Sequence, residues 1–253
     1  MKTKPGHKKH VSLLILEVCM ILLSLGYVPD GVQLNNPLHE DVQRRLVSAR
    51  FQTAAGPVRV IGAYFPNGQA VDSEKYVYKL GWIASLQAWI AQLRREEPDT
   101  GVILAGDFNI APADADVHDP AVWADGILVS GPERQALQGL LALGLHDAFR
   151  LFEQPPKLFS WWDYRALGFR RNAGLRIDLI LVSDELKPMV GRCWIDKGPR
   201  KLEKPSDHTP VVVEWGAAAT LSGADAVTAR PSSTPGRHGW HGAPGLGYSL
   251  TRV

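Results

Sequence analysis

The chain has 253 residues, of which 45% are hydrophobic and 21% are charged, and its formal net charge at pH 7 is +2. This composition excludes a disordered or fibrous chain and is that of a globular protein with one large domain or two small ones. The net charge is too small to indicate a polyanionic partner by itself, so a nucleic-acid interface would have to rest on a local cluster of basic residues. The two cysteines, Cys19 and Cys193, form neither a metal-ligand spacing nor a disulfide framework, which favours a reducing compartment.

Residues 1–41 form a segment that is first basic and then apolar. Lysines precede the run VSLLILEVCMILLSLGY, as in the n-region and h-region of a signal peptide, but Glu17 interrupts the run and no clear cleavage site follows. The run is also shorter than the ~20 apolar residues that span a membrane. Three interpretations stay open: an export or anchor signal, a buried helix or strand, and a chain start that does not belong to the following domain. We expect a cytoplasmic protein without a stable membrane partner, with export as the alternative.

Residues 42–215 alternate between strand-like and helix-like patterns and predict one domain. Apolar periodicity and turn residues predict, in chain order, strands at 45–51 and 58–64 joined as a hairpin, a helix at 73–95, a strand at 102–105, a helix at 132–143, and strands at 175–182 and 211–215. Such alternation predicts an α/β or α+β sandwich whose sheet faces are covered. Residues 216–253 are rich in Ala, Gly, Ser and Pro without an amphipathic period, which predicts a disordered tail.

The stretch GVILAGDFNIAP, residues 101–112, places Asp107 and Asn109 directly after an apolar strand. Gly, Asp, Asn and Pro are common turn formers, so the stretch could be only a turn. In extended backbone, residues i and i+2 point to the same face, so Asp107 and Asn109 would place an acceptor beside a donor at the end of a strand. This pair is suited to metal-assisted hydrolysis, and the turn stays open as the alternative.

A second candidate pair comes from two later segments. Asp178 lies inside the apolar strand RIDLILVS, where an unpaired carboxylate would be costly, and a buried Asp normally has a partner. Asp207 and His208 lie in the turn KPSDHTP before the last strand, where a histidine could also be an ordinary loop residue. An Asp178–His208 pair would fix the ring tautomer and raise the basicity of the imidazole.

The segment FSWWDYRALGFRRNAGLRID combines basic and aromatic residues. Its arginines are Arg165, Arg170, Arg171 and Arg176, and its aromatic residues include Trp161, Trp162, Tyr164 and Phe169. A cationic loop with aromatic side chains can hold phosphates while an aromatic ring packs against a sugar or a base. The alternative is a solvated arginine loop whose aromatic side chains belong to the core.

The motifs GDFNIAP, SWWDYR with NAGLRIDLILVS, and SDHTPVVVEW, in this order, resemble the exodeoxyribonuclease III family of the endonuclease/exonuclease/phosphatase superfamily. The earlier segment NGQAVDSEKYVYKLGW resembles the part of that family that follows its tyrosine strand. The resemblance runs from Val42 to Trp215. It implies a four-layer sandwich of two β-sheets flanked by helices. It also implies a monomeric base excision repair enzyme that hydrolyses duplex DNA at 3′ ends and abasic sites.

The resemblance also implies roles for individual residues. Asp107 would orient or deprotonate the attacking water, Asn109 would hold a phosphate oxygen, and His208 paired with Asp178 would stabilise charge in the transition state. Tyr64 would lie near the scissile phosphate. A single Mg²⁺ or Mn²⁺ would be held by the predicted ligands Asp107, Asn109, Asp207 and His208. The predicted DNA-binding residues are Trp161, Arg165, Arg170, Arg171, Asn172 and Arg176, with Trp161 against the deoxyribose or abasic site.

The N-terminal part departs from the family pattern. The family begins with a strand that carries a catalytic asparagine and a second strand that ends in Gln-Glu, whose glutamate is the main metal ligand, and neither is found here. Glu17 lacks the motif context of that ligand. We expect the domain to lack its usual N-terminal strands, with weak Mg²⁺ binding and an exposed sheet edge. The alternatives to an active nuclease are a non-catalytic DNA-binding protein and an exported phosphodiesterase.

Overall fold

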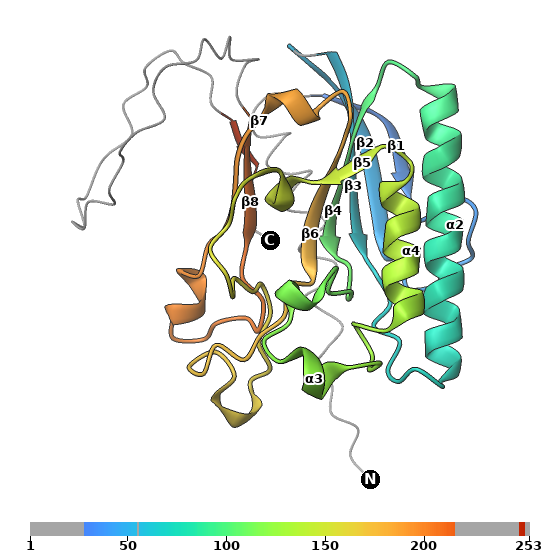
Figure 1. Ribbon diagram of the computed structural model, residues 1–253. Coiled ribbons are helices and arrows are strands. Elements are labelled where there is room, and N and C mark those ends of the chain that lie inside the picture. The colour runs from blue at the N-terminus through green and yellow to red at the C-terminus, as the bar shows by residue number, and fades with distance from the viewer. Residues whose placement is uncertain (1–27, 55, 216–247, 251–253) are drawn as a thin grey trace, which may run out of the picture.

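The computed structural model describes residues 28–54, 56–215 and 248–250 (Figure 1). The expectations for Glu17, for the rest of residues 1–27 and for most of the tail lie outside the described residues. No helix in the described part of the chain is long and apolar enough to cross a membrane.

A six-stranded sheet forms the centre of the fold, with the strand order β1-β2-β3-β4-β6-β5. Its strands are β1 (Pro29–Leu34), β2 (Leu46–Thr53), β3 (Gly56–Tyr64), β4 (Gly101–Asp107), β5 (Leu145–Asp147) and β6 (Asp178–Ser183). β3 and β4 pair in parallel, and the other neighbouring strands pair antiparallel. A parallel pair requires a crossover connection, which the long helix between β3 and β4 provides.

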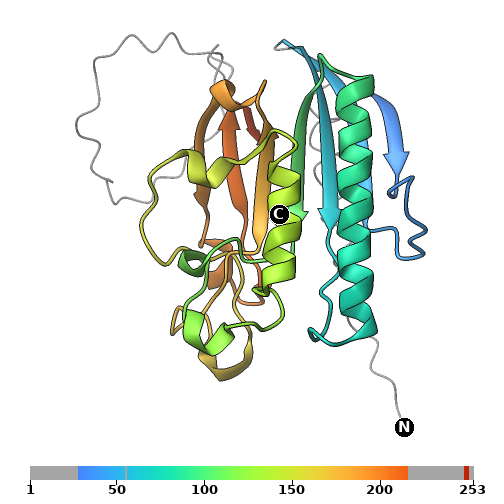
Figure 2. The same ribbon diagram turned by 45° about the vertical axis from the view of Figure 1, so that its right-hand side comes forward.

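Helices cover one face of this sheet (Figure 2). They are α2 (Glu74–Glu96) and α4 (Gly131–Leu141), and a short helix α3 (Pro120–Trp123) lies in the loop before α4. Ser73 caps α2, because its side chain accepts a hydrogen bond from the backbone N–H of Tyr76. The apolar stripe of α2, including Trp82, Ile83 and Leu86, is fully buried against the sheet.

A second sheet packs on the opposite face of the large sheet. It consists of β7 (Val190–Ile195), β8 (Val211–Trp215) and β9 (Tyr248–Leu250), in that order. Because alternate residues of a strand point to opposite faces, Ile61 of β3 faces the helices while Val60 faces the second sheet. Single-turn 3₁₀ helices connect the elements: η1 (Asp114–Asp116), η2 (Ala148–Leu151), η3 (Arg165–Leu167), η4 (Lys187–Met189) and η5 (Pro199–Lys201).

The predicted α/β class with two sheets and flanking helices is confirmed, and every predicted strand and helix is found. The strand predicted from residue 175 begins only at Asp178, since Arg176 turns into a buried ion-pair network before it. Tyr248–Leu250 pair with β8 although the composition predicted disorder there. The boundary at residue 42 stays a prediction, but β1 joins the sheet ahead of it, and Asp41 accepts a hydrogen bond from the indole of Trp82.

Candidate active site

Three predicted site residues lie side by side along the edge of the large sheet that is formed by the ends of its strands. Tyr64 is opposite Asp107 in the parallel pair of β3 and β4, and Asp107 is opposite Asp178 in the antiparallel pair of β4 and β6. β4 ends and β6 begins at this edge, where the connecting loops gather in the lower part of Figure 1. The strand register therefore places two buried carboxylates next to each other.

His208 completes this group from the loop before β8. Its Nδ1 lies 2.9 Å from Oδ2 of Asp178 and 3.0 Å from Oδ1, so the predicted Asp178–His208 pair is present. Its Nε2 lies 3.9 Å from Oδ2 of Asp107. Burial would lower the pKa of His208, but Asp178, with further help from Asp107 and Asp207, raises it to about 10. The ring is therefore a cation at neutral pH, held between two carboxylates.

Asp107 is buried and held by a local turn. Its Oδ1 accepts the backbone N–H of Asn109 at 2.8 Å, and its Oδ2 accepts the Asn109 side-chain amide at 3.0 Å. Burial raises the pKa of Asp107 to about 7, the charge of Asp178 adds to this, and the positive charge of His208 opposes it. A carboxyl with such a pKa can accept a proton near neutral pH. The predicted turn is thus present and Asp107 lies beside Asn109 in it, whereas the role of this pair in hydrolysis stays a prediction.

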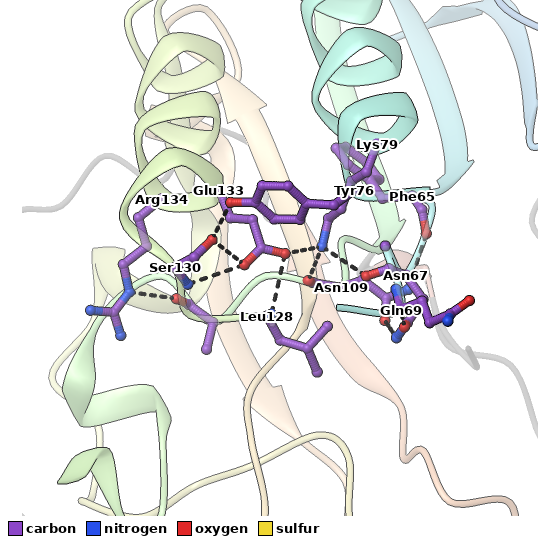
Figure 3. A network of polar contacts seen from close by, with 12 residues as sticks. Phe65, Asn67, Gln69, Tyr76, Lys79, Asn109, Leu128, Ser130, Glu133 and Arg134 are labelled. Carbon is purple, nitrogen blue, oxygen red and sulfur yellow. Dashed lines mark hydrogen bonds and ion pairs between the residues drawn. The ribbon is translucent and has the colours of Figure 1, made fainter. Parts of the chain in front are cut away.

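The N–H groups and the oxygen of the Asn109 side-chain amide all have hydrogen-bond partners within the protein. Nδ2 donates to the backbone carbonyl of Phe65 as well as to Asp107, and Oδ1 accepts from Nδ2 of Asn67 at 3.0 Å. Figure 3 shows this side chain between the loop after β3 and the end of β4. Because both amide protons are already donated, Asn109 is arranged to orient Asp107. The predicted hydrogen bond to a phosphate oxygen stays a prediction.

Tyr64, Asp207 and Trp161 surround the group. Burial, followed by the charge of Asp107, raises the pKa of Tyr64, so its hydroxyl keeps its proton. The indole N–H of Trp161 donates to Oδ2 of Asp207 at 3.1 Å, and Trp161 also forms a β-bridge with His208. Trp161 is half-buried at this edge, so its position is compatible with the predicted contact to a sugar.

The predicted DNA-binding residues separate into two sets. Arg165, Arg170 and Arg171 are exposed on the loop, with Arg165 paired to Asp163, whereas Asn172 holds the loop by donating to the backbone carbonyl of Lys157. Arg176 was predicted to contact DNA, and the structure corrects this. Its side chain is fully buried and bonded to Asp116 and Asp147, so it stabilises the core below the loop.

The predicted metal ligands do not form a complete cage. Among the described residues, no three His, Cys, Asp or Glu side chains gather in a way that could hold a metal ion. Both oxygens of Asp107 are bonded to Asn109, Asp207 is bonded to Trp161, and His208 is a cation paired with Asp178. A hard cation requires several free oxygen ligands. The described residues therefore do not fit Mg²⁺ or Mn²⁺ without further ligands.

Three residues near the site were not predicted from the sequence. Asn67 contacts Asn109 directly, and Lys79 and Glu133 form an ion pair beneath both, with no exposed side-chain surface. Lys79 lies on the buried face of α2 at the helical spacing of the core residues Tyr76 and Trp82. A charged residue on an otherwise apolar helix face was the signal that could have indicated it.

Two carboxylates and an imidazole at the strand ends of a two-sheet α/β sandwich, with exposed arginines on a loop at the same end, are suited to the hydrolysis of phosphate esters. Residues 36–208 match the model of the Endonuclease/Exonuclease/phosphatase family. The chain therefore belongs to this family, and within it to the group of exonuclease III and AP endonucleases.

Individual relatives agree with this assignment. The chain is 36% identical over 185 residues to exodeoxyribonuclease III of Haemophilus influenzae, covering 70% of this chain and 68% of that protein. The structure of the 3′ phosphatase NExo from Neisseria bound to a product DNA hairpin is 41% identical, with a TM-score of 0.70, over 76% of this chain and 72% of that chain. An AP endonuclease from Archaeoglobus fulgidus is 31% identical, with a TM-score of 0.68 and the same coverage, 76% and 72%. The chain thus spans about two thirds to three quarters of these relatives.

Proposed function

We propose that this protein hydrolyses phosphodiester bonds in duplex DNA, removing nucleotides or blocking groups from 3′ ends and incising at abasic sites. The observation that carries the proposal is the row of Asp107 and Asp178 with His208 between them, where β4 ends and β6 begins; Trp161, at the start of the segment with the exposed arginines, forms a β-bridge with His208. The DNA-bound Neisseria relative supports DNA as the partner. We also propose that the protein is a monomer, and analytical ultracentrifugation tests this oligomeric state directly.

The two buried ionisable groups have complementary tasks in this proposal. Asp107, with its pKa near 7, accepts a proton from the attacking water, while Asn109 fixes the direction of the carboxylate. The His208 imidazolium, held by Asp178, stabilises the negative charge that develops on the phosphate in the transition state. Dependence on Mg²⁺ or Mn²⁺ stays a prediction.

A second candidate function is DNA binding without turnover. The observation that favours it is the incomplete set of metal ligands among the described residues. The exposed arginines and Trp161 would still hold a duplex in this case.

One assay separates these two functions. The full chain is incubated with a duplex that carries an abasic-site analogue and with a duplex that has a recessed 3′ end, in Mg²⁺, in Mn²⁺ and in chelator. We expect cleavage with the metal, and a rate about 10²- to 10⁴-fold lower for Asp107→Ala. Asp99→Ala, an exposed carboxylate at the opposite end of β4, is the matched control and keeps the activity. Salt-sensitive binding by folded protein without any cleavage would instead support the non-catalytic function.

A further inference from the structure

We propose that the buried ion pair of Lys79 and Glu133 is a positioning device for Asn109, and through it for Asp107. The inference rests on the proposed function for its catalytic meaning, but the geometry stands independently of it. The residues concerned come from α2, α4 and the two loops that follow β3 and β4 (Figure 3).

The ammonium group of Lys79 is shared between the pair and the site. Nζ donates to the backbone carbonyl of Asn109 at 2.7 Å and to that of Asn67 at 3.3 Å, and it is bonded to Oε1 of Glu133. Asn67 in turn donates its side-chain amide to Oδ1 of Asn109. Lys79 therefore fixes Asn109 twice, directly through its backbone and indirectly through Asn67.

The conformation of Asn109 explains why such support is needed. Its φ of +51° lies in the left-handed region, which Asn adopts more readily than most other residues with a side chain because its amide can bond locally, but less readily than Gly. This conformation turns the Asn109 N–H toward Oδ1 of Asp107 and the side-chain amide toward Oδ2. The carbonyl that the turn leaves inside the protein requires a donor, and Lys79 supplies it. Loss of that donor would weaken the turn that aims Asp107.

Glu133 holds the lysine in place from the other side. Besides the bond from Lys79, its carboxylate accepts hydrogen bonds from the backbone N–H groups of Leu128 and Ser130 and from the Ser130 hydroxyl. The Ser130 hydroxyl oxygen in turn lies 2.6 Å from the hydroxyl oxygen of Tyr76. A fully buried ammonium is stable only with such a fixed counter-charge.

The loop that contains Asn67 is also packed onto Lys79. A Cβ added to Gly68 would lie 3.1 Å from Cδ of Lys79 and 2.9 Å from Cδ1 of Ile127. The lysine stem and the loop are therefore in close contact. The competing explanation is that the pair only fastens α2 to α4, with no effect on the site.

Lys79→Met separates the two explanations, with Arg59→Met as the matched control. Arg59 is also a buried cation, paired with Glu97, but it lies at the Val102 end of the β3–β4 pair. Arg59 and Tyr64 are five positions apart in an extended strand, which places Arg59 about 16 Å from the site. Should Lys79→Met fail to fold, Lys79→Met/Glu133→Gln removes both charges and leaves no unpaired ion.

Two measurements are compared between the variants. Hydrogen exchange of the Asn109 backbone N–H, followed by NMR, reports the turn without any substrate. We expect its exchange to be at least about tenfold faster in Lys79→Met than in Arg59→Met, because the turn loses a hydrogen bond from a charged donor and opens more often. The kcat on an abasic-site duplex should fall by about 10- to 100-fold while KM stays constant.

Equal exchange of Asn109 in the two variants would overturn the proposal and leave the pair as a fastening between helices. If the wild-type chain cleaves no DNA, the proposed function fails, but the Asn109 exchange still decides the role of Lys79. A fall in kcat that Arg59→Met reproduces would likewise count against positioning.

Discussion

At the scale of single residues, the site depends on the close approach of β3 and β4 at Gly106. Gly106 has a φ of +145°, and a Cβ at this position would lie 1.9 Å from the backbone oxygen of Ala63. A side chain here would push the two strands apart directly beside the Tyr64–Asp107 pair. The glycine of the GDFN motif is therefore a structural requirement for bringing Asp107 to the sheet edge.

Gly106→Ala should consequently lower the free energy of unfolding by at least about 1–3 kcal/mol, because the backbone is strained and the strands must separate. Urea denaturation monitored by circular dichroism measures this change. Gly81→Ala is the control, since Gly81 lies in α2 with no atom within 4 Å of an added Cβ. It should raise stability by about 0.5–1 kcal/mol. An unchanged midpoint for Gly106→Ala would show that the strands tolerate the added methyl group.

The site residues that could be predicted from the sequence are those whose role is indicated by their neighbours in the chain. Asp107 and Asn109 are two positions apart at the end of an apolar run, and Asp178 interrupts another, so their place at strand ends was predictable. The predicted extended backbone ends at Asp107, however, and a turn with Asn109 at a φ of +51° brings the two side chains together. Arg176 shares its segment with exposed arginines, and nothing local reveals that Asp116, 60 positions away, buries it. Lys79 does have a local signal, its position on an apolar helix face, but its partner Glu133 is 54 positions away and cannot be identified from the sequence alone.

At the scale of elements, strands with continuous apolar runs were predictable and short or mixed strands were not. β4 is buried along most of its length and reads as VILA, whereas β5 has three residues and β7 carries the exposed Gly191 and Arg192. These two strands form because neighbours supply their hydrogen bonds and apolar contacts. Tertiary context decides such elements, and a single sequence does not contain it.

The reactivity of the Cys193 thiol in β7 shows whether the second sheet stays packed on the large sheet. Burial, followed by the charge of Asp147, raises the pKa of its thiol to about 12 against the opposing effect of Arg176. Since the folded-state pKa is raised, the stability contributed by the protonated thiol is complete below pH 9 and is lost as pH rises toward 12. At pH 8 the native thiol should therefore resist iodoacetamide and react only on unfolding.

Mass spectrometry of Cys19→Ser protein, in which Cys193 is the remaining cysteine, measures this reaction with and without urea. Alkylation of Cys193 as fast in native buffer as in urea would contradict the packed arrangement of the two sheets.

At the scale of the whole molecule, the loop with the exposed arginines and the candidate active site lie at the same end of the fold. The helices α2 and α4 cover one face of the large sheet, whereas the loop of residues 161–176 lies toward the end of the strands where Asp107 lies and where His208 approaches it from the loop before β8 (Figures 1 and 2). The net charge of +2 does not reveal this arrangement, because it says nothing of the three exposed arginines, Arg165, Arg170 and Arg171, that lie on this one loop. A duplex held by the loop would present its backbone to the carboxylates and the imidazolium.

This arrangement predicts how DNA affinity depends on salt. Neutralising a phosphate releases counterions, so each arginine that contacts the backbone contributes about 1 to the slope of log K against log [salt]. Arg170→Ala/Arg171→Ala should therefore weaken binding of any duplex sequence and reduce the slope by about 2. Fluorescence anisotropy between low and moderate salt measures both quantities. Arg95→Ala/Lys187→Ala removes two exposed cations at the opposite end of the strands, one in the last turn of α2 and one after β6, and should leave the slope unchanged. Equal slopes for the two double variants would place the DNA on another surface of the protein.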